Sequence, residues 1–157
     1  MRHLDIFIEK LILLCFLIFG TACSEEDDEL YKLNYGTSFN MCSGYCKNEM
    51  TLESHFVTYN HTGWVDSIQT ITCRDELEIN SWKYFETHLN INDFFDLPKT
   101  IGCPDCADGG AEWIEIELDD GVKHKVTFEY GHEPDMLKDY IVKLREQMNK
   151  SVHCGEY

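Results

Sequence analysis

Two close pairs of cysteines are the side chains of this chain whose types and spacing could support chemistry. Three residues separate Cys42 from Cys46, and two separate Cys103 from Cys106. The second spacing is that of a redox dithiol, and four thiolates together could hold Zn²⁺ in a tetrahedral site. Redox catalysis is disfavoured, because aspartates flank Cys106 and no βαβ pattern surrounds it. Disulfides and a zinc site remain as the two interpretations of these pairs.

An acidic loop beside the second pair offers oxygen ligands. Asp105, Asp108 and Glu112 surround two consecutive glycines. Carboxylates in a glycine-containing loop can bind Ca²⁺, but this spacing differs from that of an EF-hand. We therefore carry the three residues as a weak candidate cation site beside the simpler interpretation, a solvated acidic loop.

No other residues form a catalytic pattern. The seven histidines show no metal-ligand spacing, and His124 falls on the apolar side of its strand, where we expect a hydrogen-bonded interior residue. The chain has no Gly-x-Ser-x-Gly motif, phosphate-binding loop or His-Glu-x-x-His motif. The sequence therefore favours a binding or structural role over an enzymatic one.

The N-terminus predicts export and a lipid anchor. An uncharged apolar run from residue 11 to 19 is too short to span a bilayer, which takes roughly 20 residues, and has the length of a signal-peptide core. It ends in Gly20-Thr21-Ala22-Cys23, which resembles the lipobox of bacterial lipoproteins. This resemblance implies a signal peptide over 1–22 and acylation of Cys23. A cleaved secretory signal and an N-terminal anchor helix are the alternatives.

Export affects how the remaining cysteines are interpreted. Apart from Cys15 and Cys23 the chain has six, an even number, and disulfides are expected in an oxidising compartment. We expect the local pairs Cys42–Cys46 and Cys103–Cys106. The two loops should lie close together at one end of the sheet. Cys73 and Cys154 either pair or stay free.

Charge limits the partners of the mature protein. The formal net charge is −16, which argues against nucleic acid and against electrostatic docking on anionic lipid. Membrane contact should therefore come through the lipid alone. The acidic string of residues 25–29 falls in a tether over 23–30. It is either a solvated spacer or, as in some surface-exposed outer-membrane lipoproteins that it resembles, a sorting signal.

Residues 31–157 have the length of a single domain, and their alternating patterns predict an antiparallel sheet. The expected strands cover 33–39, 50–60, 66–79, 112–118 and 122–130, with a turn at 61–63. The sequence Asp-Asp-Gly at 119–121 is a strong hairpin signal between the last two.

Two helices complete the predicted fold. The first begins at Trp82 with Ser81 as its N-cap, and a further helical turn covers 90–98. The last follows Pro134, with an apolar face formed by Met136, Tyr140, Ile141, Leu144 and Met148. The order β-β-β-α-β-β-α predicts a two-layer α+β fold with the helices on one face of the sheet.

Two segments resemble a family of uncharacterised bacterial domains. They are Cys42-Ser43-Gly44-Tyr45-Cys46 before a strand, and Cys103-Pro104-Asp105-Cys106 followed by Ala-Asp-Gly-Gly. The resemblance covers most of residues 33–148 and implies an exported or lipid-anchored domain, with no assigned activity. We expect an outer-membrane lipoprotein that binds a protein or glycan ligand, or plays a structural role. A thiol or zinc protein is the alternative.

Overall fold

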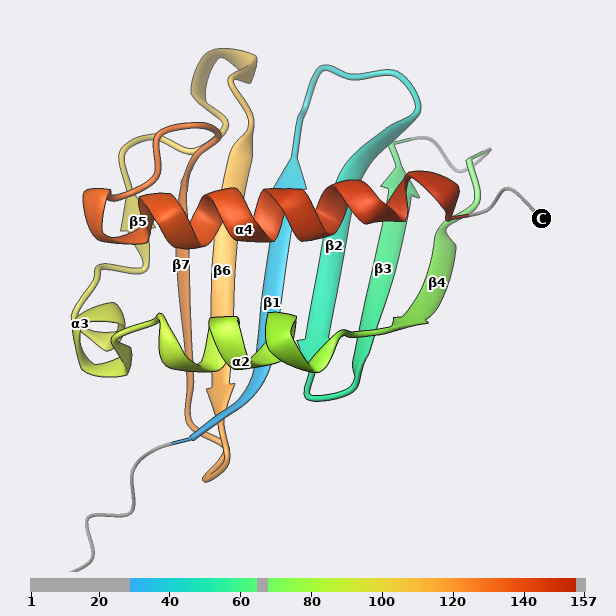
Figure 1. The fold of residues 1–157 in the computed structure, drawn as a ribbon. Coiled ribbons are helices and arrows are strands. Elements are labelled where there is room, and N and C mark those ends of the chain that lie inside the picture. Colours follow the sequence, from blue (N-terminus) through green and yellow to red (C-terminus); the bar gives the residue numbers. More distant parts are fainter. Residues whose placement is uncertain (1–28, 65–67, 155–157) are drawn as a thin grey trace, which may run out of the picture.

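A single sheet with helices makes this an α+β protein. The computed structural model describes residues 29–64 and 68–154 (Figure 1). Seven strands form one mostly antiparallel sheet in the order β4-β3-β2-β1-β6-β7-β5. The strands are β1 (Leu30–Ser38), β2 (Tyr45–Glu53), β3 (Phe56–Gly63), β4 (Ile71–Glu76), β5 (Thr100–Ile101), β6 (Ala111–Leu118) and β7 (Lys123–Glu129). The helices are α2 (Ile79–Thr87), α3 (Ile91–Phe95) and α4 (Lys138–Asn149).

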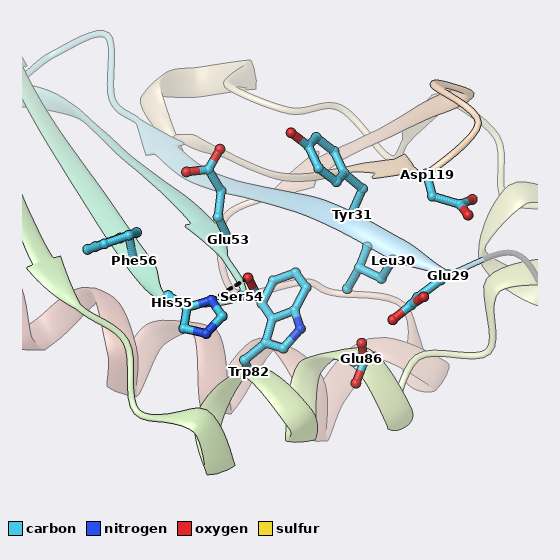
Figure 2. A pocket seen from close by; sticks show the side chains of 10 residues that line it. All are labelled: Glu29, Leu30, Tyr31, Glu53, Ser54, His55, Phe56, Trp82, Glu86 and Asp119. Carbon is cyan, nitrogen blue, oxygen red and sulfur yellow. Dashed lines mark hydrogen bonds between the residues drawn. The ribbon is translucent and has the colours of Figure 1, made fainter.

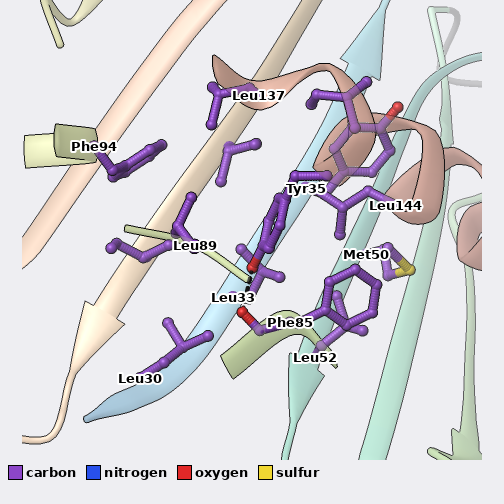
Figure 3. Packing of buried hydrophobic residues seen from close by; sticks show 14 of the residues in the cluster. Leu30, Leu33, Tyr35, Met50, Leu52, Phe85, Leu89, Phe94, Leu137 and Leu144 are labelled. Atoms are coloured by element: carbon purple, nitrogen blue, oxygen red, sulfur yellow. Dashed lines mark hydrogen bonds between the residues drawn. The ribbon is translucent and has the colours of Figure 1, made fainter. Parts of the chain in front are cut away.

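The hydrophobic core lies between the sheet and helices α2 and α4, which cross the same face of the sheet in Figure 1. Alternate residues of the central strands, such as Leu33 and Tyr35 of β1, point into this space together with Phe85 of α2 and Leu144 of α4 (Figure 3). Each is almost fully buried. Burial of such side chains stabilises the fold by about 1.5–3 kcal/mol each.

The predicted hairpin at the C-terminal side of the sheet is confirmed. Strands β6 and β7 pair antiparallel across residues 119–121, where Gly121 has a φ of +85°. Ile114, Val126 and their alternate neighbours face the core, as expected. On the opposite face Lys123 lies 3.0 Å from Glu117. The Asp-Asp-Gly signal works because only glycine adopts this positive φ without strain.

A second hairpin overturns the prediction of one strand over residues 50–60. Ser54 and His55 form a two-residue turn between β2 and β3, which pair from Glu53 and Phe56 onwards. The turn contains no glycine, proline, asparagine or aspartate, and its serine is only a weak turn signal. The apolar pattern does carry one: Leu52 and Val57 face each other in the core, although residues five apart in one strand would point to opposite faces.

The segment around the first helix also differs from its prediction. Residues 61–63 end strand β3 and do not form a turn. Of the strand predicted over 66–79, residues 66 and 67 lie outside the described residues, and within the rest the strand is limited to β4. Helix α2 begins at Ile79, two residues before the predicted N-cap Ser81, and its cap residue Glu78 makes no side-chain capping bond. Burial of Trp82 and Phe85 against the sheet therefore outweighs the local capping preference.

The C-terminal part adds a short strand that the sequence does not reveal. Strand β5 pairs parallel with β7, inside the segment predicted as a loop. Helix α4 follows a 3₁₀ turn at Asp135–Leu137, so that Leu137 is buried and Met136 is exposed, the reverse of the expected face at that position. The chain thus has four strands before its first described helix, and the predicted order is wrong in that respect.

The face of the sheet opposite the helices carries Trp113 among mainly polar side chains. Trp113 of β6 lies flat against Gly36 of β1, where a Cβ atom would come within 2.2 Å of the indole ring. The side-chain ammonium groups of Lys125 and Lys47 lie 4.6 and 5.8 Å from its ring centroid. Gly36 is therefore required by this close approach and not by its backbone conformation.

Candidate functional site

Six cysteines form three pairs at disulfide geometry. The Cα–Cα distances are 5.7 Å for Cys42–Cys46, 5.4 Å for Cys103–Cys106 and 5.8 Å for Cys73–Cys154. The expected local pairs thus fit disulfides, and the third pair ties strand β4 to the segment after α4. These bonds fix the loops of the domain.

The two loops that carry the local pairs lie at the same end of the sheet. Ser38 at the end of β1 pairs with Ala111 at the start of β6. A Cβ atom on Gly110 would lie 2.5 Å from the ring of Phe39, so the two loops are in contact. Among the described residues, no group of three or more His, Cys, Asp or Glu side chains is placed to share a metal ion. The zinc interpretation therefore gains no support from the geometry.

The three acidic-loop candidates are not brought together as a cation site. Asp105 and Asp108 occupy the tight loop after Cys103, both with positive φ values of 63° and 60°. Glu112 lies in β6 with a fully buried side chain, and both its oxygens accept hydrogen bonds from other residues. His124, the expected interior histidine, is half-buried against Phe94 and contacts the carbonyl of Leu97 through Nε2 at 2.9 Å.

A row of polar residues crosses the core-facing side of the sheet at this same end. Register places Glu112 opposite Thr37, Thr37 opposite Asn48, and Asn48 opposite His61. Paired residues point to the same face, and in the preceding row that face carries Tyr35, Met50 and Tyr59 of the core. The hydrophobic core thus ends in a polar layer formed by four neighbouring strands.

Glu112 is held by Arg145 of helix α4. Arg145 donates through Nε to Oε1 at 3.0 Å and through Nη2 to Oε2 at 2.6 Å, while Tyr35 donates its hydroxyl to Oε1 at 2.5 Å. The backbone N–H of Gly131 completes the set at 3.3 Å. A carboxylate that is 0% exposed is therefore fully hydrogen-bonded, as burial of a charge requires.

A second carboxylate balances the same guanidinium. Glu133 accepts from Nη2 of Arg145 at 2.8 Å. Burial raises the pKa of Glu133, but hydrogen bonds and the charge of Arg145 lower it by a larger amount. The pKa of Glu133 is therefore lower than its ordinary value. Burial and the charge of Glu112 raise the pKa of the Tyr35 hydroxyl, which stays protonated. One cation thus serves two anions, and this centre carries net negative charge.

A cavity of about 340 Å³ opens between the polar row and the C-terminal half of α4. Its lining residues come from β1 and the residue after it, β2, β3, the residue after β7, the C-terminal half of α4 and the turn that follows: Tyr35, Thr37, Phe39, Asn48, His61, Tyr130, Arg145, Met148, Asn149 and Ser151. The loop closed by Cys42–Cys46 positions its rim, since Phe39 donates its backbone N–H to the carbonyl of Cys46 at 3.0 Å. The Phe39 ring packs edge-on against Tyr130 at 4.9 Å.

Several polar groups of this cavity lack a protein partner within the described part of the chain. His61 Nε2 is buried and makes no hydrogen bond. Thr37 and Ser151 are only 8% and 7% exposed, and no side-chain hydrogen bond joins either hydroxyl to a described residue. Buried polar groups in folded proteins are nearly always hydrogen-bonded to protein, water or ligand. The cavity is therefore built to hold polar contents.

The protonation of His61 defines what its free nitrogen can do. Nδ1 lies 2.5 Å from Asn48 Oδ1, which can only accept, so Nδ1 carries the proton and Nε2 has a free lone pair. Burial lowers the pKa of His61, which keeps the ring neutral at neutral pH. The cavity therefore presents an acceptor at His61 and hydroxyls at Thr37 and Ser151 that both donate and accept.

Sequence reasoning missed these residues for a physical reason. The sequence predicts His61 in a turn, and nothing in the spacing of Thr37, Asn48 and Arg145 relates them. Strand register brings Thr37 and Asn48 together with His61, and Arg145 reaches the same row from helix α4. The apolar pattern holds one signal for this site. Leu52 and Val57 are both apolar although they are five residues apart, which indicates a turn between them, and that turn places His61 opposite Asn48.

The cleavage site and Cys23 lie outside the described residues. Within the described ranges, none of the helices combines the length and apolar content that crossing a membrane requires. No family model matches the chain, and no curated protein matches it. The likeness to the uncharacterised Cys-x-Gly-x-Cys domains therefore stays a prediction from the quoted motifs.

Proposed function

We propose that this chain is a lipid-anchored envelope protein whose domain binds a small neutral saccharide in the cavity between the polar row and α4. The observation that carries the proposal is the buried, unpartnered Nε2 of His61, which lines the cavity together with the hydroxyls of Thr37 and Ser151. Water alone can satisfy such groups, but a row that ends a hydrophobic core and opens to solvent is also the arrangement of a ligand site.

The charges of the site favour a neutral ligand. The positive charge of Arg145 is neutralised by Glu112 and Glu133, and His61 is uncharged, so an anion would meet net negative charge. The free groups both donate and accept hydrogen bonds, which matches the hydroxyls of a sugar. Phe39 and Tyr130 supply apolar ring surface at the rim for the C–H face of a sugar ring. The volume is near the lower end of ligand pockets, roughly 300–1,000 Å³, and suits one or two sugar rings.

The anchor is the second part of the proposal. Acylation of Cys23 would attach the domain to the outer membrane through its tether, and multiple acyl chains are needed for stable attachment. Strand β1 runs away from the tether, so Thr37 lies at the end of the sheet opposite to Leu30, about 23 Å away at roughly 3.3 Å per residue. The saccharide cavity would then face away from the membrane.

The anchor can be tested with the Cys23→Ala variant. We expect this variant to remain unprocessed or to be released in soluble form, whereas the unchanged protein fractionates with the membrane and incorporates labelled palmitate. The Cys15→Ala variant, altered inside the signal segment, serves as control and should be processed normally. Membrane fractionation of Cys23→Ala at the mature size would contradict the lipid anchor.

Binding can be tested by calorimetric titration with a panel of neutral monosaccharides and disaccharides, with glucuronate as the anionic comparison. We expect one or more neutral sugars to bind. Thr37→Val preserves shape and removes a hydroxyl, so the dissociation constant should rise about two- to tenfold, the effect of one hydrogen bond of about 0.5–1.5 kcal/mol. Thr58→Val, on the opposite face of the sheet, is the matched control and should change nothing. Binding that is equal in both variants, or tighter binding of glucuronate, would refute the site.

A further inference from the structure

A second cavity lies at the tether end of the sheet, opposite to the saccharide cavity. Its volume is about 440 Å³, and Figure 2 shows it between the start of β1, the β2–β3 turn and helix α2. Its lining residues are acidic and aromatic, with few others: Glu29, Leu30, Tyr31, Glu53, Ser54, His55, Phe56, Trp82, Glu86 and Asp119. This composition differs from that of the first cavity, which is lined mainly by polar side chains and whose carboxylates are paired with Arg145.

Three of its carboxylates are uncompensated. Glu53 pairs with Lys32 at 3.4 Å and with Arg74 at 3.9 Å. No lysine or arginine in the described ranges lies within ion-pair distance of Glu29, Glu86 or Asp119. Like charges around one cavity repel one another, and a bound cation relieves this repulsion. The cavity thus attracts positive charge and repels anions.

The indole N–H of Trp82 gives a second and independent indication of a ligand. Trp82 is only 5% exposed, yet its indole N–H makes no hydrogen bond to a described residue. Figure 2 shows this nitrogen on the side of the ring that faces Glu29 and Glu86. Tryptophan N–H groups usually find an acceptor when the residue is buried. A ligand that fits here should therefore bring an acceptor next to its positive charge.

The same end of the domain already binds cations of its own chain on aromatic rings. The guanidinium of Arg74 lies 4.0 Å from the ring centroid of Phe56, and the ammonium of Lys32 lies 5.4 Å from that of Tyr31. These rings are 41% and 55% exposed, so surface remains for further contact. Cation–π contacts contribute about 0.5–1 kcal/mol at exposed sites.

We propose that this acidic–aromatic cavity binds a basic segment of a partner protein. A lysine or arginine side chain of the segment would lie among Glu29, Glu86 and Asp119, and an adjacent peptide carbonyl would accept the indole N–H of Trp82. A peptide segment supplies both groups at fixed spacing, and its aliphatic side-chain carbons match the rings of Tyr31 and Phe56. The chain's own tether does not fit, because the residues directly before Glu29 are also acidic.

The test uses the full chain in neutral detergent and two blocked peptides, acetyl-Gly-Lys-Arg-Lys-Gly-amide and the same peptide with glutamine at the three basic positions. Calorimetry should detect the basic peptide and not the glutamine peptide. Affinity should fall at least fivefold between low salt and 0.5 M NaCl, since partly exposed charges are screened. Equal binding of both peptides, or none of the basic peptide at low salt, would overturn the proposal.

Matched variants locate the binding. Glu86→Gln with Asp119→Asn should weaken the basic peptide at least fivefold, whereas Glu146→Gln with Asp139→Asn, which removes the same charge from helix α4, should weaken it less than twofold. Trp82→Phe keeps a ring and removes the N–H, and should weaken binding about threefold, with circular dichroism confirming that the variant is folded. Equal effects of the two charge pairs would indicate net charge and not this cavity, and tight binding of a glucosamine oligomer without the peptide would assign the cavity to an amino sugar instead.

Discussion

Arg145 should be among the most sensitive positions of the domain, because removing it leaves a buried charge without its partner. The change that isolates this effect is Arg145→Met, which keeps most of the aliphatic volume and removes the guanidinium. Glu112 then retains only the Tyr35 hydroxyl and the Gly131 N–H, in a position with 0% exposure. Loss of one partner of a buried ion pair costs about 3–5 kcal/mol. That is a large part of the 5–15 kcal/mol by which such domains are stable.

Urea unfolding followed by circular dichroism measures this loss directly. The matched control is Arg74→Met, because Arg74 also contacts a carboxylate and a ring but is 56% exposed, and exposed pairs contribute about 0–1 kcal/mol. We expect the midpoint of Arg145→Met to fall well below that of Arg74→Met. Adding Glu112→Gln to Arg145→Met should restore part of the loss. Equal costs at the two arginines would refute the idea that Glu112 depends on Arg145.

The pH dependence gives a further check with a definite sign. The pKa of Glu133 is lowered in the folded protein, chiefly by Arg145 acting against burial. Stability from this pairing is present above the unfolded pKa, near 4.3, and is lost as pH falls through the lower folded pKa. Arg145→Met has no such contribution from this pair. The gap in unfolding free energy between the two proteins should therefore narrow from pH 6 to pH 3, and a constant gap would contradict the assignment.

Two further predictions concern covalent and steric constraints. Replacing Cys73 and Cys154 by serine should lower the unfolding free energy by about 4–5 kcal/mol, whereas replacing Cys42 and Cys46 should lower it by about 2 kcal/mol. The difference arises because the two bridges span sequence separations of 81 and 4. Equal losses in urea unfolding would show that strain or residual structure outweighs loop closure. Gly36→Ala should cost about 1–3 kcal/mol and shift tryptophan fluorescence, because the new Cβ would displace Trp113, whereas Gly109→Ala, whose nearest atom would be a carbonyl oxygen at 3.3 Å, should change the fluorescence little.

The sequence predicts those elements whose signals are local. The hairpin at residues 119–121 was predictable because a glycine with positive φ sits between two alternating strands. The turn at Ser54 and His55 has no comparable residue. The sequence indicates it only through Leu52 and Val57, which are both apolar although residues five apart in one strand would point to opposite faces. Helix α2 starts where its apolar face meets the sheet and not at the best capping residue, so tertiary packing decides its boundary.

The candidate sites depend on information that no local pattern contains. Thr37, Asn48, His61 and Glu112 become neighbours only through the register of four strands, and Arg145 reaches them from a helix at the other end of the sequence. The cysteine motifs were visible, and their contribution is indirect: the Cys42–Cys46 loop positions Phe39 at the rim of the cavity. Cys42 and Cys46, whose spacing suggests chemistry, therefore contribute to the cavity by positioning Phe39 and not by reacting.

The two cavities differ in charge and lie at opposite ends of strand β1, so their ligands should bind at different distances from the membrane. Glu29 lines the acidic–aromatic cavity and directly continues the acidic string, so a chain anchored at Cys23 keeps this cavity within about 20 Å of the membrane, the reach of six extended residues. The saccharide cavity lies at the far end of β1. A basic partner held at the anchored end would leave the saccharide cavity open, because the hydrophobic core between α2, α4 and the sheet separates them. Binding of the basic peptide and of a neutral sugar should therefore be independent, and a shift of more than twofold in either dissociation constant on saturation with the other would show that the two ends are coupled.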